Sequence, residues 1–330
     1  MKKSLIVMSI CLLSSALWAA GAVNAKTAKP AQKTANKKTE AAAKQPQEKI
    51  ELVVVQSPEY LSGQPEGQII FGLANHFQAE PVVTVVDVEQ AKQIPALANL
   101  DYSFLPLYMA KKTPKLREKV AQYIQAGAIL ETEEYLVFPG LSSNGVYANK
   151  TAQPGVLEIF VMSQCPYGVM AENLVIEAFK AGKVPADKII RLRYIVNYND
   201  KNGQFQSLHG SGEWEEDVRQ LLIAKYYPTK LWKYLEIRNK DYHSSRWDKA
   251  MEEAGINVKK ITKKFDTEGL ELLKAEAAYG REYAINASPS FLWEGKEKLD
   301  FGSVHKKEGF DFLNPAAGRA NKGGAPVGSC

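Results

Sequence analysis

Cysteine is scarce in this chain of 330 amino acids, which contains three copies. Cys11 falls in an apolar leader, so the exported chain would keep Cys165 and Cys330. Two cysteines so far apart cannot form the dense disulfide framework of a small secreted domain. The four histidines are not spaced from one another or from a cysteine as zinc ligands are, so no metal or other cofactor is expected.

Long apolar runs are missing after residue 25, so no stable membrane span is expected once the leader is removed. Residues 1–25 combine two lysines, an apolar run and small residues before Ala25, which is typical of a secretory signal peptide. A retained membrane anchor is the alternative for this segment. Residues 26–49 are rich in Lys, Ala, Gln and Thr, which indicates a disordered tether. We therefore expect an exported protein, periplasmic or extracellular.

Basic residues are concentrated outside the globular part of the chain. The formal net charge is +5, but residues 1–49 hold nine Lys and two Glu, which leaves −2 for the remainder. No glycine-rich loop of the kind that cradles phosphate is found either. A nucleic-acid partner is therefore not expected.

Two α/β blocks follow the tether, residues 50–150 and residues 151–315, with a tail at 316–330. In the first block we predict strands at 50–55, 81–88, 104–110 and 133–138, and helices at 67–77 and 113–129. In the second block we predict strands at 157–162, 188–198 and 287–295, a helix from 166 to about 181, helices at 213–227, 229–240, 245–256 and 267–285, and a last strand and helix within 298–314.

The stretch "LEIFVMSQCPYGVMAENLVIEAFKAG", residues 157–182, carries the chemistry. A strand-like run ends at Cys165 and a helix begins there, with Pro166 suited to the first helical turn. The amino end of a helix stabilises an anion, so the pKa of a thiol placed there should fall and the thiolate should be ready for disulfide exchange. Near the end of the block, Ser288 and Pro289 precede a strand. A cis proline there would expose the backbone of Ser288 as an edge for a substrate peptide.

"FVMSQCPYG" at 160–168 and "INASPSFLWEG" at 285–295, with a helical insertion at about 211–285 between them, resemble the thioredoxin-like superfamily and, within it, the DsbA-like branch. The resemblance covers about residues 155–315. It implies that Cys165 is the nucleophile and Pro289 the cis proline. It also implies that Pro166 and Tyr167 are the variable pair of the motif.

The chain departs from that family at Gly168, where the resemblance places the resolving cysteine of a C-x-x-C motif. Cys165 can attack a disulfide but cannot resolve the product at that position, and Gly168 should prevent a site disulfide. Three outcomes stay open: an external thiol resolves the mixed disulfide, Cys330 resolves it from the tail, or the site holds substrates covalently or has lost redox function. A flexible tail of about 16 residues spans on the order of 20–25 Å, enough to reach the site.

The first block is expected to be a cysteine-free, degenerate thioredoxin-like domain that could bind partners or form a homodimer. Leu105-Pro106 falls where a cis proline would, although an ordinary trans proline at a strand start is the alternative. Ser57-Pro58 follows the first strand, where a thiol would be expected. The fold class is thus α/β, with tandem thioredoxin-like domains, the second carrying the helical insertion.

Two further residues near the site are assigned ordinary roles. His209 is expected to be a solvated loop histidine, although its loop could approach Cys165. Glu172, two turns along the helix from Cys165, is expected to be a surface charge rather than a proton shuttle.

The leading hypothesis is a monothiol thiol–disulfide oxidoreductase, closer to a reductase or isomerase than to an oxidase. Cys165 would be its nucleophile, Cys330 a candidate resolving thiol, and Pro166, Tyr167, Gly168, Ser288 and Pro289 would bind the substrate. Its partners would be protein thiols and disulfides and an external thiol reductant. The alternative is a non-catalytic thioredoxin-like module or chaperone that binds extracytoplasmic polypeptides.

Overall fold

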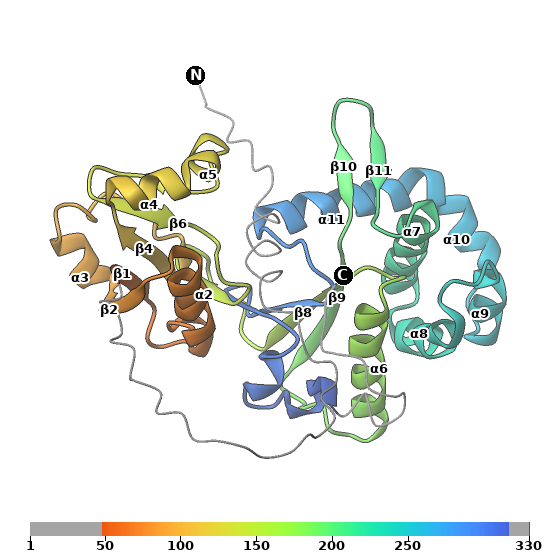
Figure 1. Ribbon diagram of the computed structural model, residues 1–330. Helices are drawn as coiled ribbons and strands as arrows, with labels where there is room; N and C mark the ends of the chain where they lie inside the picture. The colour runs from red at the N-terminus through yellow and green to blue at the C-terminus, as the bar shows by residue number, and fades with distance from the viewer. Residues whose placement is uncertain (1–47, 317–329) are drawn as a thin grey trace, which may run out of the picture. The chain divides into compact units, whose positions relative to one another are not determined.

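The computed structural model describes residues 48–316 and residue 330 (Figure 1). The chain divides into two compact units, the first ending at Ala148 and the second running from Asn149. The predicted signal peptide, the tether up to residue 47 and tail residues 317–329 lie outside the described residues. Within the part that is described, no helix has both the length and the apolar composition needed to cross a membrane.

The first unit contains a five-stranded sheet in the order β2-β1-β4-β6-β5. Its strands are β1 (Lys49–Gln56), β2 (Glu80–Asp87), β4 (Leu107–Lys111), β5 (Leu130–Glu131) and β6 (Tyr135–Phe138). β1 is parallel to β2 and antiparallel to β4, which is antiparallel to β6. A further antiparallel pair, β3 (Phe104–Leu105) and β7 (Gly145–Tyr147), places Leu105 opposite Val146.

Helices cover both faces of the first unit's sheet. They are α2 (Gly67–Phe77), α3 (Val88–Gln93), α4 (Pro114–Lys119) and α5 (Ala121–Gln125), with a 3-10 turn at Leu61–Gly63. Side chains alternate along a strand, so Leu52 and Val54 pack with α2 and α4, whereas Val55 packs with α3.

Two predicted elements of the first unit are broken in the structure. The strand expected at 104–110 is interrupted at Pro106, whose peptide bond with Leu105 is cis. Proline has no N–H to donate to a strand ladder, which accounts for the break. The helix expected at 113–129 is split into α4 and α5 at Val120, which has non-helical dihedrals (φ −111°, ψ 11°).

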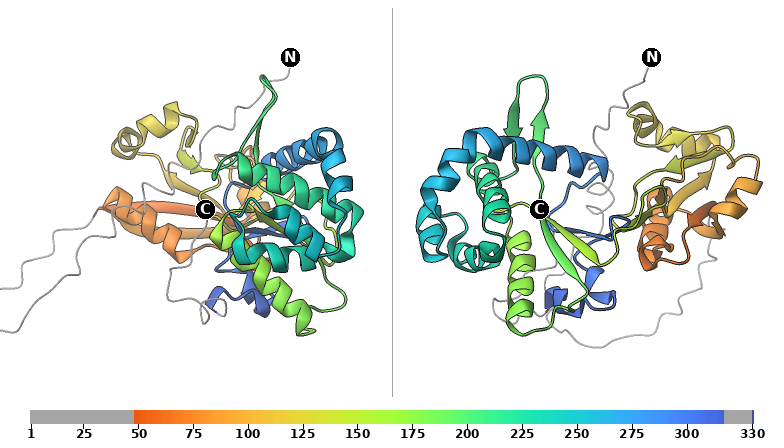
Figure 2. Two further views of the ribbon diagram at one scale, coloured as in Figure 1. Left: turned by 90° about the vertical axis from the view of Figure 1, so that its right-hand side faces the viewer. Right: turned by 180° about the vertical axis from the view of Figure 1, so that it is seen from behind.

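In the second unit the strands β13, β12, β8 and β9 are neighbours in one sheet. They are β8 (Val156–Val161), β9 (Ile189–Tyr194), β12 (Ser290–Trp293) and β13 (Glu297–Leu299). β8 is parallel to β9 and antiparallel to β12. All six residues of β8 are buried, as expected of a central strand covered on both faces. The hairpin of β10 (Asn197–Asn199) and β11 (Gln204–Gln206) projects from this unit (Figures 1 and 2).

The helix α6 (Pro166–Lys180) joins β8 to β9, and a group of helices lies between β11 and β12 in the sequence. This group contains α7 (Ser211–Tyr226), α8 (Leu231–Arg238), α9 (Trp247–Glu253), α10 (Val258–Lys264) and α11 (Leu270–Glu282), with 3-10 turns at Pro228–Lys230 and Asn239–Asp241. One continuous core includes Val175 of α6, Leu222 of α7 and Ile159 of β8. The helices after β11 therefore pack onto the same core as the sheet.

Three predictions for the second unit need correction. The strand expected at 188–198 is divided between β9 and β10. α10 and the π turn at Phe265–Gly269 were not predicted. The expected C-terminal helix is instead two 3-10 turns, Val304–Lys306 and Asp311–Leu313, and Gly309 between them has a positive φ that interrupts a helix.

Candidate active site

Cys165 lies at the amino end of α6, in the turn that follows β8. It is the N-cap residue, with extended dihedrals (φ −78°, ψ 123°), and Pro166 is the first helical residue. The Cys165 N–H donates to the Met162 carbonyl at 3.0 Å, and the Cys165 carbonyl accepts from the Val169 N–H at 2.9 Å. Cys165 thus stands at the positive end of a 15-residue helix, although its side chain makes no capping hydrogen bond to the helix N–H groups.

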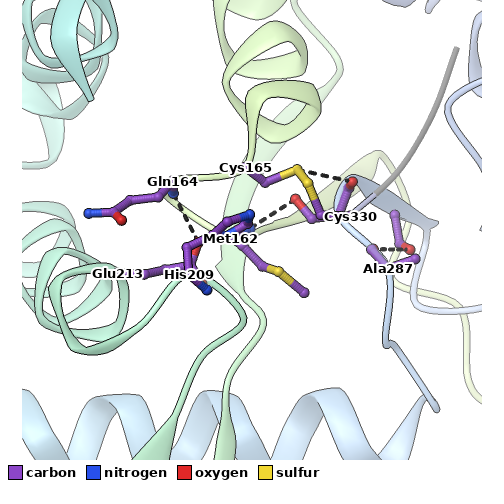
Figure 3. Close-up of a disulfide and its surroundings, with 9 residues drawn as sticks. Met162, Gln164, Cys165, His209, Glu213, Ala287 and Cys330 are labelled. Atoms are coloured by element: carbon purple, nitrogen blue, oxygen red, sulfur yellow. Dashed lines mark hydrogen bonds and ion pairs between the residues drawn. A yellow bond between two sulfur atoms is a disulfide. The ribbon is translucent and has the colours of Figure 1, made fainter. Parts of the chain in front are cut away.

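Cys165 is joined to Cys330 by a disulfide, with a Cα–Cα distance of 6.2 Å across a sequence separation of 165 residues (Figure 3). The expectation that Gly168 prevents a site disulfide is therefore wrong, because the bond is made with the tail instead of within the helix. Cys165 has no exposed surface in this state. While the disulfide is intact, Cys165 is therefore not a free thiolate ready for exchange.

The backbone of Ser288 holds Cys330 in place. The Cys330 N–H donates to the Ser288 carbonyl at 2.9 Å, and the Ser288 N–H donates to the Cys330 carbonyl at 3.2 Å. This exchange of two hydrogen bonds is the pattern of a hydrogen-bonded pair in an antiparallel ladder. The peptide bond between Ser288 and Pro289 is cis, and the Cys165 sulfur lies 3.5 Å from the Ser288 carbonyl oxygen.

Gly168 lies against the side chain of Ser288. A Cβ at position 168 would be 2.7 Å from the Ser288 Oγ and 3.1 Å from the Met162 carbonyl oxygen. The Ser288 Oγ in turn accepts the Met162 N–H at 2.9 Å. Position 168 therefore has no room for a side chain while Ser288 makes this contact. A cysteine at position 168 would clash with the Ser288 side chain.

The other two motif residues differ in exposure. Pro166 is exposed and Tyr167 is half-buried, so both can present surface to a partner. Cys165, Cys330, Gly168 and Ser288 come together directly, whereas Pro166 and Tyr167 border them in the sequence.

Two acidic residues of α7 hold the turn that precedes Cys165, and the sequence analysis missed this role. The Gln164 N–H donates to Glu213 Oε1 at 3.1 Å, and the Ser163 N–H donates to Asp217 Oδ1 at 3.3 Å. Both carboxylates are fully buried. Their spacing of four residues, which places them on one helix face, is the sequence signal that points to a shared partner.

His209 is exposed in the loop before α7, as expected, and its side chain is also bonded to the residue that holds this turn. Its Nδ1 lies 2.7 Å from Glu213 Oε1, and its backbone N–H donates to Glu213 Oε2 at 3.2 Å (Figure 3). Glu213 thus links the loop before α7 to the residue before Cys165.

Glu172 is not a surface charge, because only 1% of it is exposed. Its Oε2 accepts from Asn239 Nδ2 at 2.8 Å, and its Oε1 has no hydrogen-bond partner among residues 48–316 and 330. Burial raises the pKa of Glu172 to about 8. Burial likewise raises the pKa of Asp217 well above its usual value. Glu172 therefore favours its protonated form at neutral pH, which the sequence of α6 could not reveal.

The described residues contain no cluster of three or more His, Cys, Asp or Glu side chains able to hold a metal ion.

No protein-family model and no curated protein matches this sequence. Among solved structures, the chain is similar to the DsbA disulfide interchange protein from Klebsiella pneumoniae, with 16% identity, a TM-score of 0.36, and coverage of 53% of this chain and 92% of that one. It is similar to oxidised BdbD from Bacillus subtilis, with 15% identity, a TM-score of 0.37, and coverage of 56% and 96%. It is also similar to Proteus mirabilis DsbA with a non-covalently bound peptide, with 14% identity, a TM-score of 0.35, and coverage of 55% and 94%.

These structural neighbours are thiol–disulfide oxidoreductases of the DsbA type, and about half of this mixed α/β chain aligns with them. Identity and TM-score are both low in these comparisons.

Proposed function

We propose that this protein is an exported thiol–disulfide oxidoreductase with Cys165 as nucleophile and Cys330 as resolving thiol. The observation that carries the proposal is the disulfide between these residues at the amino end of α6, with Cys330 paired to the backbone before a cis proline. A purely structural disulfide would not need a helix N-terminus, whereas exchange chemistry gains from one.

The reaction cycle balances with two cysteines. In the reduced protein the Cys165 thiolate attacks a protein disulfide, forms a mixed disulfide and releases one substrate thiolate. The Cys330 thiolate then attacks the Cys165 sulfur, which releases the second substrate thiolate and forms the Cys165–Cys330 bond. Two electrons pass to the substrate, and its two released thiolates take up protons from the solvent to replace the two that the site thiols lost to it. An external dithiol returns the electrons, and the same steps in reverse would oxidise a substrate dithiol.

The substrate would be an extended polypeptide with a cysteine. Ser288, which precedes the cis residue Pro289, would offer its backbone edge, as it does to Cys330, and Pro166 and Tyr167 would flank the reacting sulfur. Gly168 supports this arrangement because its lack of a side chain lets Ser288 approach α6. The sequence reasoning disfavoured net oxidation because no site disulfide was expected. Because Cys165 forms a disulfide with Cys330, net oxidation is no longer disfavoured on this ground. The external redox partner would decide whether the protein reduces or oxidises its substrates.

The remaining features belong to the same proposal. Residues 1–25 would direct export to the periplasm or beyond, and residues 26–49 would act as a tether. The first unit would be a second thioredoxin-like domain without a thiol, used for partner binding or for a homodimer. Its β1, α2, β2 and β4 have the order and strand directions of β8, α6, β9 and β12 in the second unit, which supports a tandem arrangement.

Trapping with a model substrate tests the proposal. Reduced full-chain protein is mixed with insulin, and disulfide-linked adducts are analysed by non-reducing electrophoresis and mass spectrometry. Cys330→Ser should accumulate an adduct through Cys165, wild type should turn over without accumulation, and Cys165→Ser should form no adduct. Absence of an adduct with Cys330→Ser would refute the proposal.

Thiol titration separates exchange from the alternative of a non-catalytic binding module. In Cys330→Ser, Cys165 is the single thiol beyond the leader, so its alkylation rate can be followed against pH. A midpoint clearly below the ordinary pKa of about 8.5 supports exchange. A midpoint at or above that value favours the binding module.

A further inference from the structure

Cys330 occupies the backbone edge that a substrate cysteine would need. Ser288 has one N–H and one carbonyl facing Cys330, and both are bonded to it. Ser288 itself has no exposed surface, and neither does Cys165. No second chain can pair with Ser288 while this arrangement lasts.

The sulfur contact and the backbone contact belong to the same residue. A substrate cysteine bonded to Cys165 would have its own N–H and carbonyl within reach of Ser288, because Cys330 in the same bond uses both. Disulfide geometry restricts the distance between the two Cα atoms. A substrate cysteine in extended backbone that bonds to the Cys165 sulfur would therefore lie beside Ser288, where Cys330 lies now.

We propose that Cys330 is a tethered competitor for the substrate's own place, so that no polypeptide can pair with Ser288 in the oxidised protein until a thiol has displaced Cys330 from Cys165. This inference rests on the proposed exchange function and adds regulation to it. Polypeptide pairing with Ser288 and the Cys165–Cys330 bond exclude each other, which prevents the oxidised form from holding a substrate that it cannot reduce.

The exchange of disulfide partners at Cys165 would then be coupled to the exchange of hydrogen-bond partners at Ser288. When Cys330 attacks the Cys165 sulfur of a mixed disulfide, the bond between Cys165 and the substrate breaks and the substrate leaves with the electron pair as a thiolate. The two hydrogen bonds to Ser288 pass from the substrate cysteine to Cys330 in the same exchange. Product release is thereby built into resolution.

The first experiment measures how much the backbone edge favours a cysteine probe. Full-chain Cys330→Ser is equilibrated with acetyl-Gly-Ser-Cys-amide and, separately, with the same peptide N-methylated at cysteine. The methyl group removes the N–H that would donate to the Ser288 carbonyl. With 2-mercaptoethanol as the common reference thiol, N-methylation should lower the mixed-disulfide constant between about twofold and tenfold, the usual worth of one hydrogen bond. Equal constants for the two peptides would overturn the proposal.

The second experiment asks whether peptide and Cys330 use the same place. Amide hydrogen exchange at Ser288 is compared in oxidised wild type, in free Cys330→Ser and in the mixed disulfide of Cys330→Ser with acetyl-Gly-Ser-Cys-amide. Exchange should be at least about tenfold faster in the free variant than in the other two forms. The amides of β12 that pair with β8 serve as an internal control and should not change.

The outcomes separate the two proposals. If neither peptide forms a mixed disulfide with Cys165, the exchange function itself fails. If the mixed disulfide forms but Ser288 stays unprotected, exchange stands and the shared-place proposal is contradicted.

Discussion

In each unit, the residue before the cis proline pairs with another segment of the chain. The two units differ in how that other segment is held in place. In the first unit, Leu105 precedes Pro106 and lies opposite Val146 of β7. In the second unit, Ser288 precedes Pro289 and is paired with Cys330. β7 covers its edge as part of a strand, whereas Cys330 is anchored by a bond that a thiol can break. The backbone before the cis proline is therefore covered by a strand in the first unit, whereas in the second unit it is covered only while the disulfide of Cys330 is intact.

The helix that follows the first strand of each unit, α2 or α6, also differs in its N-cap residue. In the second unit the N-cap of α6 is Cys165, whereas the N-cap of α2 is Glu66. The backbone N–H of Glu66 donates to the Tyr108 hydroxyl at 2.8 Å, and its carboxylate accepts from the Ser142 hydroxyl. The first unit thus has a carboxyl group at this position, hydrogen-bonded within the unit, where the second unit has a sulfur.

Ser57 does not take the place of a thiol in the first unit. It follows β1, but residues 57–66 separate that strand from α2, whereas residues 162–165 separate β8 from α6. The expectation that Ser57-Pro58 marks the thiol position is therefore wrong, because the longer connection moves the helix N-terminus away from it.

Buried carboxyl groups also distinguish the units. Within the described part of the chain, every buried Asp or Glu lies in the second unit, including Glu172, Glu213 and Asp217. Burying such groups costs free energy unless they are bonded or protonated. The second unit therefore carries a pH-sensitive interior around its thiol that the first unit lacks.

The largest effect on this comparison should come from releasing Cys330. Under oxidising conditions Cys330→Ser should lower the unfolding free energy of the second unit by about 2–5 kcal/mol, because a long closed loop is lost. The first unit should not respond. Urea unfolding followed by tryptophan fluorescence reports the second unit, since Trp214, Trp232, Trp247 and Trp293 all lie there. An equal loss in the presence of a reducing agent would contradict this explanation.

Removing one buried carboxyl should reveal the pH sensitivity of the second unit. Burial raises the pKa of Glu172 from 4.5 to about 8, so its contribution to stability is complete below pH 4.5 and is lost as pH rises towards 8. Between pH 5 and pH 8 wild type should therefore lose about 3 kcal/mol more than Glu172→Gln, at 1.36 kcal/mol per pKa unit. Urea unfolding at the two pH values measures this difference.

Glu177→Gln is the matched control for this measurement, because Glu177 is an exposed residue on the same helix. It should follow wild type at both pH values. Parallel pH profiles for wild type and Glu172→Gln would show that Glu172 does not carry its proton in the folded state.

Adding a methyl group at Gly168 should cost about 1–3 kcal/mol, the usual range for overpacking. The cost of Gly168→Ala should shrink when Ser288→Ala removes the Oγ that lies 2.7 Å from the new Cβ. In the first unit, Gly145→Ala would place its Cβ 2.6 Å from the Leu105 carbonyl, a backbone atom that no side-chain change removes.

Unfolding in urea, with Gly168→Ala and Ser288→Ala alone and together, measures this coupling. Gly280→Ala in α11 is the control, since a Cβ there meets nothing within 4 Å. A cost of Gly168→Ala that is independent of Ser288 would rule out the proposed steric pairing.

The smallest effect is expected at the N-cap of α2. Glu66→Gln removes a negative charge from the helix N-terminus and should destabilise the first unit by about 0.3–1 kcal/mol, an effect that salt should weaken. Amide hydrogen exchange in β1 would measure it. An effect that does not change with salt would assign the loss to the hydrogen bond with Ser142 instead.

Much of the second unit could be anticipated from local sequence. The strand before Cys165, the helix that begins at Pro166 and the strand after Pro289 each carry their own signal in apolar pattern or proline placement. The roles of Glu172 and Glu213 could not be anticipated. A carboxylate on a helix looks the same in the sequence whether the opposite surface is water or another helix, and only packing decides its burial.

The amino-acid sequence alone determined that a lone sulfur would stand at the amino end of a helix and that position 168 would hold no thiol. Both follow from residue identity and local conformation. The tertiary structure alone decided that Cys330, 165 residues away, is the sulfur's partner and that Ser288 is the edge it pairs with. Such a pairing depends on where two distant segments meet, and local propensities contain no information about that meeting.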